Sequence, residues 1–214
     1  MEGLSNQELR EQMREIGQLL WDRRLTNAYG GNFAARVDEK SFLVTPSMLA
    51  EEKHCLLAPE NLALVDFDCN VIEGCSRLSR ETIMHAALLK AFPSVGAVIH
   101  AHPMNCMVFA AAERPIPSVT EATEKHGMTG LTKFAPMATP EMCVSVLEYY
   151  EERRAQVEEM PVACILPKHG VVVTGKNLNN AFTMLELIET DAYCALNLGN
   201  AKSVDIRIAL NKYT

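Results

Sequence analysis

The chain has 214 residues, of which 48% are hydrophobic and 22% are charged, and its formal net charge is −7. This balance is typical of a folded globular protein and excludes a disordered chain, whose hydrophobicity would be low and whose charge would be high. No apolar run reaches the roughly 18 residues that a membrane helix needs. The 20 Lys and Arg residues form no basic block, so we expect neither a membrane nor a nucleic-acid partner.

The N-terminal segment and the cysteines indicate the compartment. The first residues show neither the basic nor the apolar region of a secretory signal. The seven cysteines are odd in number and show no C-x-x-C spacing, so neither a disulfide framework nor a zinc ribbon is expected. We therefore expect a cytoplasmic protein with reduced cysteines.

The first half of the chain predicts one helix, three strands and a second helix. Apolar residues at helical spacing predict an amphipathic helix over about residues 5–25. A glycine turn follows, and strands are then predicted at 33–37, 42–45 and 62–67. Ser79 is predicted to be the N-cap of a helix that ends near Lys90.

The second half of the chain alternates strands and helices. Strands are predicted at 95–102, 162–166 and 171–174, and helices at 103–112, 139–154 and 178–198. The tail after residue 203 alternates apolar and polar residues, but its pattern assigns it to no element. Because strands occur in hairpins and in helix-flanked runs, we expect an α/β sandwich with a mostly antiparallel central sheet covered by helices. No linker or repeat divides the chain, so residues 1–214 are predicted to form one domain.

Three histidines form the sharpest chemical signal. His100 and His102 flank one alanine at the end of an apolar strand, and residues two apart on a strand point to the same face. His169, between two predicted strands, could supply a third imidazole, and three histidines with an open position are typical of a catalytic zinc site. The alternatives are histidines satisfied at a sheet edge and a histidine in a turn.

Glu81 and His85 lie in the helix before the paired histidines. A carboxylate in the first turn of a helix is favoured by the helix dipole, which is the structural explanation for Glu81. The functional explanation is a fourth metal ligand or a proton carrier, whose pKa should then lie nearer neutrality than that of a free carboxylate. His85 shares the helix face and is a rival ligand, although a packed, hydrogen-bonded histidine is the favoured interpretation.

Three short segments could hold an anion. A glycine turn exposes backbone N–H groups, a strand end offers hydroxyls, and a helix N-terminus attracts phosphate. Each of them is more often an ordinary turn or cap, and only their joint presence near one metal site favours a phosphorylated or acidic substrate. The candidate residues are Gly31, Asn32, Thr45, Ser47, Ser79 and Arg80.

These motifs, taken in order over about residues 8–200, resemble the class II aldolase family of the fuculose-phosphate aldolase and ribulose-phosphate 4-epimerase type. The matching segments are Gly31-Asn32, Val44-Thr45-Pro46-Ser47, Ser79-Arg80-Glu81 followed by His85, residues 97–102, and Lys168-His169-Gly170. The resemblance implies a central antiparallel sheet covered by helices. It also implies a C4 homotetramer with active sites between subunits.

The resemblance further implies one divalent metal per subunit, usually Zn²⁺, with Mn²⁺ or Co²⁺ as alternatives. It makes His100, His102 and His169 metal ligands and Glu81 both a ligand and the acid/base. Asn32, Ser47 and Ser79 fall at the family's phosphate-contact positions.

The sequence departs from the family pattern at three places. Arg80 replaces the second serine of the family motif and could clamp a phosphate or a carboxylate. Met48 stands where glycine is common. Glu121 replaces the tyrosine that some family aldolases use from the neighbouring subunit, which leaves the protonating residue open, with Tyr213 as a weak candidate.

The activity that the resemblance favours is reversible cleavage of a ketose 1-phosphate to dihydroxyacetone phosphate and an aldehyde. A fuculose 1-phosphate-like sugar or a 5-deoxypentulose 1-phosphate would be the substrate. A 4-epimerase is an alternative, although the family's epimerases tend to have aspartate at the positions of Glu81 and Lys125. A sugar-acid-phosphate decarboxylase, a dehydratase and a metal-free scaffold domain complete the alternatives.

Overall fold

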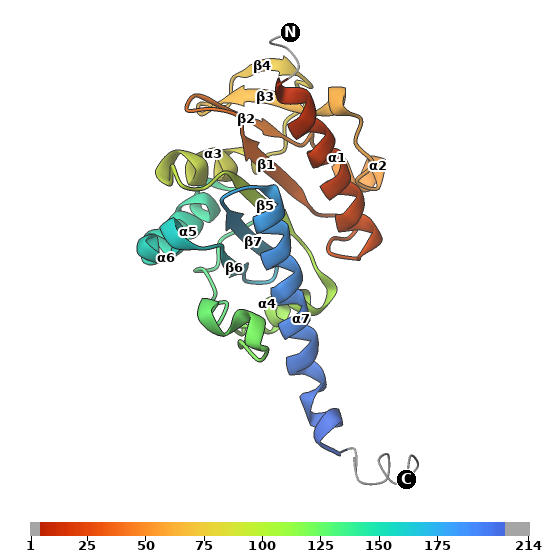
Figure 1. Cartoon of the computed structure of the whole chain (residues 1–214), viewed down its shortest axis with the longest axis vertical. Helices are drawn as coiled ribbons and strands as arrows, with labels where there is room; N and C mark the ends of the chain where they lie inside the picture. The colour runs from red at the N-terminus through yellow and green to blue at the C-terminus, as the bar shows by residue number, and fades with distance from the viewer. Residues whose placement is uncertain (1–4, 204–214) are drawn as a thin grey trace.

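The computed structural model describes residues 5–203 and contains one seven-stranded sheet covered by helices (Figure 1). The strands are β1 (Asn32–Arg36), β2 (Ser41–Val44), β3 (Ala63–Asp66), β4 (Val71–Gly74), β5 (Ala97–Ala101), β6 (Val162–Leu166) and β7 (Gly170–Gly175). Their order in the sheet is β4-β3-β2-β1-β5-β7-β6, and every neighbouring pair is antiparallel. The predicted α/β fold with an antiparallel sheet is confirmed.

Seven α-helices are described. They are α1 (Ser5–Asp22), α2 (Leu49–Lys53), α3 (Thr82–Ala91), α4 (Met104–Ala112), α5 (Pro140–Glu151), α6 (Arg154–Glu159) and α7 (Leu178–Ser203). Two short 3₁₀ helices, η2 (Pro59–Asn61) and η3 (Glu121–His126), complete the described elements. Within residues 5–203, no helix combines the length and the apolar character that crossing a bilayer requires.

Alternate residues of the central strands build two separate cores. Phe33 and Ile99 face the side covered by α1, α4 and α7. Ala34 and Val98 face the opposite side, which α3, α5 and α6 cover. This alternation, with both faces buried, explains why residues 33–35 of β1 and 97–99 of β5 are continuous apolar runs.

The structure differs from the predicted elements in five places. β4 was not predicted, because all four of its residues are exposed and give no alternating pattern. The short α2, η2 and η3 were missed as well. The helix predicted over 139–154 is divided, since α5 ends at Glu151 and α6 begins at Arg154. The alternating tail after residue 203 lies outside the described residues, and the seven cysteines are free, as expected.

The start of α3 also differs from the prediction. Ser79 is not the N-cap of this helix; its hydroxyl instead accepts a hydrogen bond from the backbone N–H of Glu81 at 3.2 Å. Glu81 itself occupies the N-cap position, and the helix begins at Thr82. The short turn formed by Ser79 therefore places the Glu81 carboxylate just before the helix rather than inside its first turn.

The register of the sheet brings distant parts of the chain to one strand end. His100 on β5 pairs with Asn32 on β1 and, on its other side, with Val172 on β7. The turn between β6 and β7 carries His169. The C-terminal end of β5 thus lies between the first residue of β1 and the first residues of β7, and the candidate site forms at this edge.

Candidate metal centre

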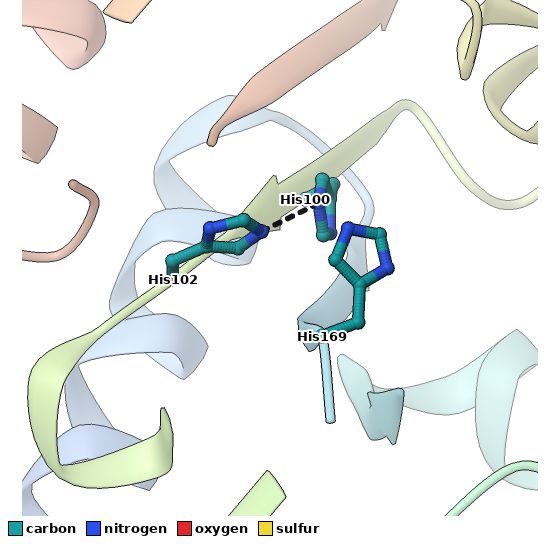
Figure 2. Close-up of side chains that lie close together, drawn as sticks. All are labelled: His100, His102 and His169. Atoms are coloured by element: carbon teal, nitrogen blue, oxygen red, sulfur yellow. Dashed lines mark hydrogen bonds between the residues drawn. The ribbon is translucent and has the colours of Figure 1, made fainter. Parts of the chain in front are cut away.

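Three imidazoles converge at the end of β5. The Nε2 atoms of His100 and His102 are 3.1 Å apart, and His169 brings a ligand nitrogen within 4.8 Å of both (Figure 2). Two nitrogens bound to one tetrahedral zinc ion at about 2.0–2.1 Å lie about 3.3 Å apart. The spacing is therefore one that a single ion could share with little movement of the rings.

The hydrogen bonds at the outer nitrogens leave the inner nitrogens free to bind. Nδ1 of His100 donates to the carbonyl oxygen of Val171 at 2.9 Å, and Nδ1 of His102 lies 3.4 Å from Oδ1 of Asn27. In a neutral ring each donated Nδ1–H leaves a lone pair on Nε2. Two such lone pairs facing each other at 3.1 Å repel unless a cation or a proton lies between them.

Glu81 completes the set of donors. Its Oε2 lies 3.4 Å from Nε2 of His100, its Oε1 lies 3.5 Å from Nε2 of His169, and Oε2 accepts a hydrogen bond from Nδ2 of Asn32 at 2.7 Å. Burial by itself raises the pKa of Glu81, but His100, the Asn32 amide, His169 and His85 together lower it to about 2. The expected near-neutral pKa of Glu81 is therefore wrong for this arrangement, since the surrounding donors stabilise the anion.

Two of the three imidazoles are held in the neutral form. Burial, followed by the neighbouring imidazoles, lowers the pKa of His102 to about 3 and that of His169 to about 4. A metal ion binds neutral imidazole and ionised carboxylate. At pH 7 these groups therefore have the protonation states that a metal site requires.

Acid is expected to destabilise the metal-free protein through these groups. The folded-state pKa values of His102 and His169 lie below the 6.5 of an unperturbed histidine, and that of Glu81 lies below its ordinary 4.5. As the pH falls below about 6.5, the unfolded chain takes up protons that the folded site does not, so the free energy of unfolding decreases. Between pH 6.5 and pH 5 the loss is at most about 2 kcal/mol for each histidine.

Urea unfolding of chelator-treated protein at pH 7 and pH 5 measures this effect. The midpoint is expected to be lower at pH 5. An unchanged or higher midpoint at pH 5 would contradict the pKa values assigned to the imidazoles.

Two glycines make room for the histidine rings. A Cβ atom at Gly30 would lie 2.0 Å from Nδ1 of His102. A Cβ atom at Gly170 would lie 2.5 Å from Cδ2 of His102, 3.1 Å from Cε1 of His100 and 2.7 Å from the carbonyl oxygen of Ala101. The glycine of the late His-Gly pair is therefore required for the packing of the imidazoles against β7.

Gly170→Ala is expected to displace the His102 ring and to weaken zinc binding by more than tenfold. The clash with the backbone of Ala101 cannot be relieved by a side-chain rotation, so a loss of about 1–3 kcal/mol in unfolding free energy should accompany it. Gly199→Ala is the matched control, because a Cβ atom there meets nothing within 4 Å. Zinc titration and urea unfolding measure both effects; wild-type zinc affinity in Gly170→Ala would show that the packing does not position the ring.

A cleft of about 280 Å³ opens onto the imidazoles and Glu81. Most of the residues predicted to contact an anion line it, namely Gly31, Asn32, Ser47, Ser79 and Arg80. Gly31 has a φ of +105°, which allows the tight turn. Met48 also lines the cleft and has a φ of 60°, so the backbone keeps a conformation that favours glycine although the residue is methionine.

The structure does not bring Thr45 to the cleft. Its side chain is fully buried, and its Oγ1 accepts a hydrogen bond from the backbone N–H of Phe33 at 3.1 Å. Glu121 and Lys125 are exposed on η3 and do not line the cleft, and Tyr213 lies outside the described residues. The predicted phosphate contact of Thr45 is therefore not supported.

Sequence reasoning missed several residues around the site. Tyr29, Met137 and Ala138 line the cleft, and Asn27 contacts His102. Asn27 and Tyr29 belong to the predicted glycine turn over residues 27–32, so their place in it was a usable signal. Met137 and Ala138 come from a loop with no distinctive motif, and only the fold places them here.

Comparisons with known proteins identify the family. Residues 11–196 match the family described as Class II Aldolase and Adducin N-terminal domain, so the chain belongs to this family. Class II aldolases are metal-dependent, and the cluster of His100, His102 and His169 could bind the metal.

Individual relatives differ in the reaction that they are named for. The chain is 28% identical to an L-fuculose phosphate aldolase of Methanococcus maripaludis over 88% of this chain and 96% of that protein. It is 30% identical to a methylthioribulose-1-phosphate dehydratase of Xanthomonas campestris pv. campestris over 89% of this chain and 88% of that protein. A solved L-fuculose 1-phosphate aldolase structure is 25% identical and matches with a TM-score of 0.76 over 95% of this chain and 93% of that chain.

Proposed function

We propose that the protein is a metal-dependent aldolase that reversibly cleaves a ketose 1-phosphate to dihydroxyacetone phosphate and an aldehyde. The observation that carries the proposal is the convergence of three imidazoles and one carboxylate in a cleft. The relatives named as fuculose-phosphate aldolases, which match nearly the whole chain, support the choice of reaction.

In this proposal His100, His102 and His169 hold one divalent cation, and Glu81 is the fourth ligand. Three nitrogen donors and one oxygen donor suit Zn²⁺, and Mn²⁺ or Co²⁺ are alternatives that fit the same donors. The bound ion would act as a Lewis acid that polarises the carbonyl oxygen of the substrate.

Glu81 also serves as the acid/base. In the direction of synthesis it removes a proton from the carbon beside the carbonyl group of dihydroxyacetone phosphate. In the direction of cleavage it returns that proton to the same carbon. A carboxylate with a pKa of about 2 is a weak base. The role therefore requires that Glu81 lose part of its contact with the imidazoles or with Asn32 when the substrate binds.

The remaining cleft residues are proposed to hold the phosphate. Ser47 and Ser79 offer hydroxyls, the turn at Gly31 offers backbone N–H groups, and Arg80 supplies positive charge at the exposed rim. A guanidinium binds phosphate oxygens in pairs, so Arg80 can take the place of the serine that the family motif has there.

A panel of ketose 1-phosphates, including 5-deoxy sugars, tests the proposal with zinc-loaded protein. Release of dihydroxyacetone phosphate is coupled to NADH oxidation. At least one sugar is expected to give chelator-sensitive oxidation. Metal-loaded protein that consumes none of the panel would contradict the proposed reaction.

A dehydratase is the second candidate, because a relative named methylthioribulose-1-phosphate dehydratase is 30% identical over most of this chain. Mass spectrometry separates the two candidates: a dehydratase product has lost one water and keeps its carbon chain, whereas an aldolase yields two fragments. The same experiment reveals carbon dioxide loss by a decarboxylase and an isomeric product from a 4-epimerase.

Family membership also leads us to infer a homotetramer with active sites between subunits, built from one domain per chain and located in the cytoplasm. Sedimentation of the purified protein measures the subunit number. A monomer that turns over substrate would contradict this part of the proposal.

A further inference from the structure

Three buried side chains form a path from the candidate metal centre into the protein. Asn32 on β1 donates from Nδ2 to Oε2 of Glu81 at 2.7 Å, and its Oδ1 lies 2.5 Å from Nε2 of His85 on α3. His85 is fully buried, and Asn32 and Glu81 are each 8% exposed. Water therefore cannot replace the contact between His85 and Asn32.

The chemistry of the three groups fixes the direction of both hydrogen bonds. The Glu81 carboxylate only accepts, so the amide NH₂ of Asn32 must face it. Oδ1 of Asn32 then faces His85 and also only accepts, so Nε2 of His85 must carry a hydrogen. Reversing the amide would place two acceptors against each other at Glu81.

The other ring nitrogen of His85 agrees with this assignment. Nδ1 is buried and has no hydrogen-bond partner among residues 5–203. A hydrogen on Nδ1 would be a buried donor without a partner, so the ring with its hydrogen on Nε2 alone fits this environment. An unpaired acceptor is tolerated in a protein interior more readily than an unpaired N–H donor.

His85 is not the rival metal ligand that the sequence allowed. The ligand atoms that gather at the end of β5 belong to His100, His102 and His169. Nε2 of His85 instead hydrogen-bonds to Asn32. Asn32 pairs with His100 in the sheet, so its side chain links α3 to the end of β5 that carries the imidazoles. His85 therefore reaches Glu81 through an amide on another element, although it follows Glu81 by one turn of α3.

We propose that His85 is a positioning residue that holds the amide of Asn32 in the one orientation presenting NH₂ to Glu81, and thereby fixes the carboxylate beside the imidazoles. The inference rests on the proposed function, since that function gives Glu81 its part in the reaction. It assigns Asn32 an internal role in addition to the phosphate contact expected at its position.

Two substitutions at His85 test the proposal. His85→Leu fills similar space but removes the donor, whereas His85→Gln can keep an N–H near the position of Nε2. Loss of such an outer partner of a metal ligand costs about 10- to 100-fold. We expect His85→Leu to lose this much in kcat and in zinc affinity with little change in KM, and His85→Gln to recover most of both.

A matched control separates positioning from the packing of α3. Leu88→Met is a volume-conserving change in the same buried helix and touches none of these hydrogen bonds, so its kcat and zinc affinity should remain near wild type. Asn32→Leu should reproduce the His85→Leu loss of zinc affinity, and the double variant should lose no more zinc affinity than the larger single loss. Additive losses, or equal losses in His85→Leu and His85→Gln, would overturn the proposal.

A measurement on the unaltered protein does not depend on activity or on the folding of variants. ¹⁵N NMR of the imidazole rings reports which nitrogen of each neutral histidine carries hydrogen. The proposal predicts hydrogen on Nε2 of His85, and hydrogen on Nδ1 would overturn it. If no sugar phosphate is cleaved, the zinc affinities and this spectrum still decide the role of His85, so failure of the two proposals can be distinguished.

Discussion

Glu81→Gln is expected to lower the kcat of ketose 1-phosphate cleavage by about 10²- to 10⁴-fold, the range typical of lost general acid–base catalysis. Glutamine has nearly the same shape, and its carbonyl oxygen can still face Asn32. It cannot accept and return a proton at carbon. Because Gln also lacks the negative charge that faces the imidazoles, zinc affinity should fall as well, so kcat is measured at saturating zinc.

Glu159→Gln is a suitable control, since it removes one exposed carboxylate at the end of α6 that does not line the cleft. It should leave kcat and zinc affinity unchanged. If zinc-saturated Glu81→Gln cleaved the sugar at a rate near that of wild type, Glu81 would not be the acid/base.

His100→Ala is expected to reduce zinc affinity by more than 100-fold and to remove activity at micromolar zinc. Even outer partners of metal ligands contribute about 10- to 100-fold, and a direct ligand contributes more. His100 is 1% exposed, and its Nε2 lies 3.1 Å from Nε2 of His102 and 3.4 Å from Oε2 of Glu81. Equilibrium dialysis gives the affinity, and the coupled assay gives the activity.

His54→Asn is the matched control for the loss of a histidine. His54 is exposed, stacks on Trp21 and has a φ of 50°, a conformation that asparagine tolerates. Its zinc affinity should equal that of wild type. Wild-type zinc affinity in His100→Ala would show that the ion binds elsewhere.

Part of the imidazole cluster was predictable because its signal is local. His100 and His102 share one strand end, and the residue pattern before them predicts a buried strand. His169 was harder to place, since only the pairing of β5 with β7 brings its turn to the same edge. The sequence contains no direct record of that pairing, so the third imidazole depended on the chemistry of three-histidine sites and on the family resemblance.

The parts that were mispredicted depend on tertiary contacts. Thr45 follows a strand, a position where a hydroxyl can bind phosphate. Its hydroxyl instead accepts a hydrogen bond from the backbone N–H of Phe33 on the neighbouring β1. Serine is a common N-cap residue, but the hydroxyl of Ser79 accepts a hydrogen bond from the backbone N–H of Glu81. The helix therefore begins only at Thr82. β4 was missed because a strand with no buried face carries no periodic signal.

The role of Asn32 shows the same limit. Its place in a glycine-asparagine turn suggested contact with an anion, and it does line the cleft. Both of its polar side-chain atoms are nevertheless engaged by Glu81 and His85. A partner 53 residues away along the chain cannot be read from a local motif.

Anomalous diffraction from zinc-soaked crystals at the zinc absorption edge tests the central claim most directly. We predict one strong peak per chain within about 2.0–2.1 Å of Nε2 of His100, His102 and His169, with a Glu81 oxygen or a water completing the coordination. A peak bound to other residues, or none at saturating zinc, would contradict the assignment of these imidazoles to one metal ion.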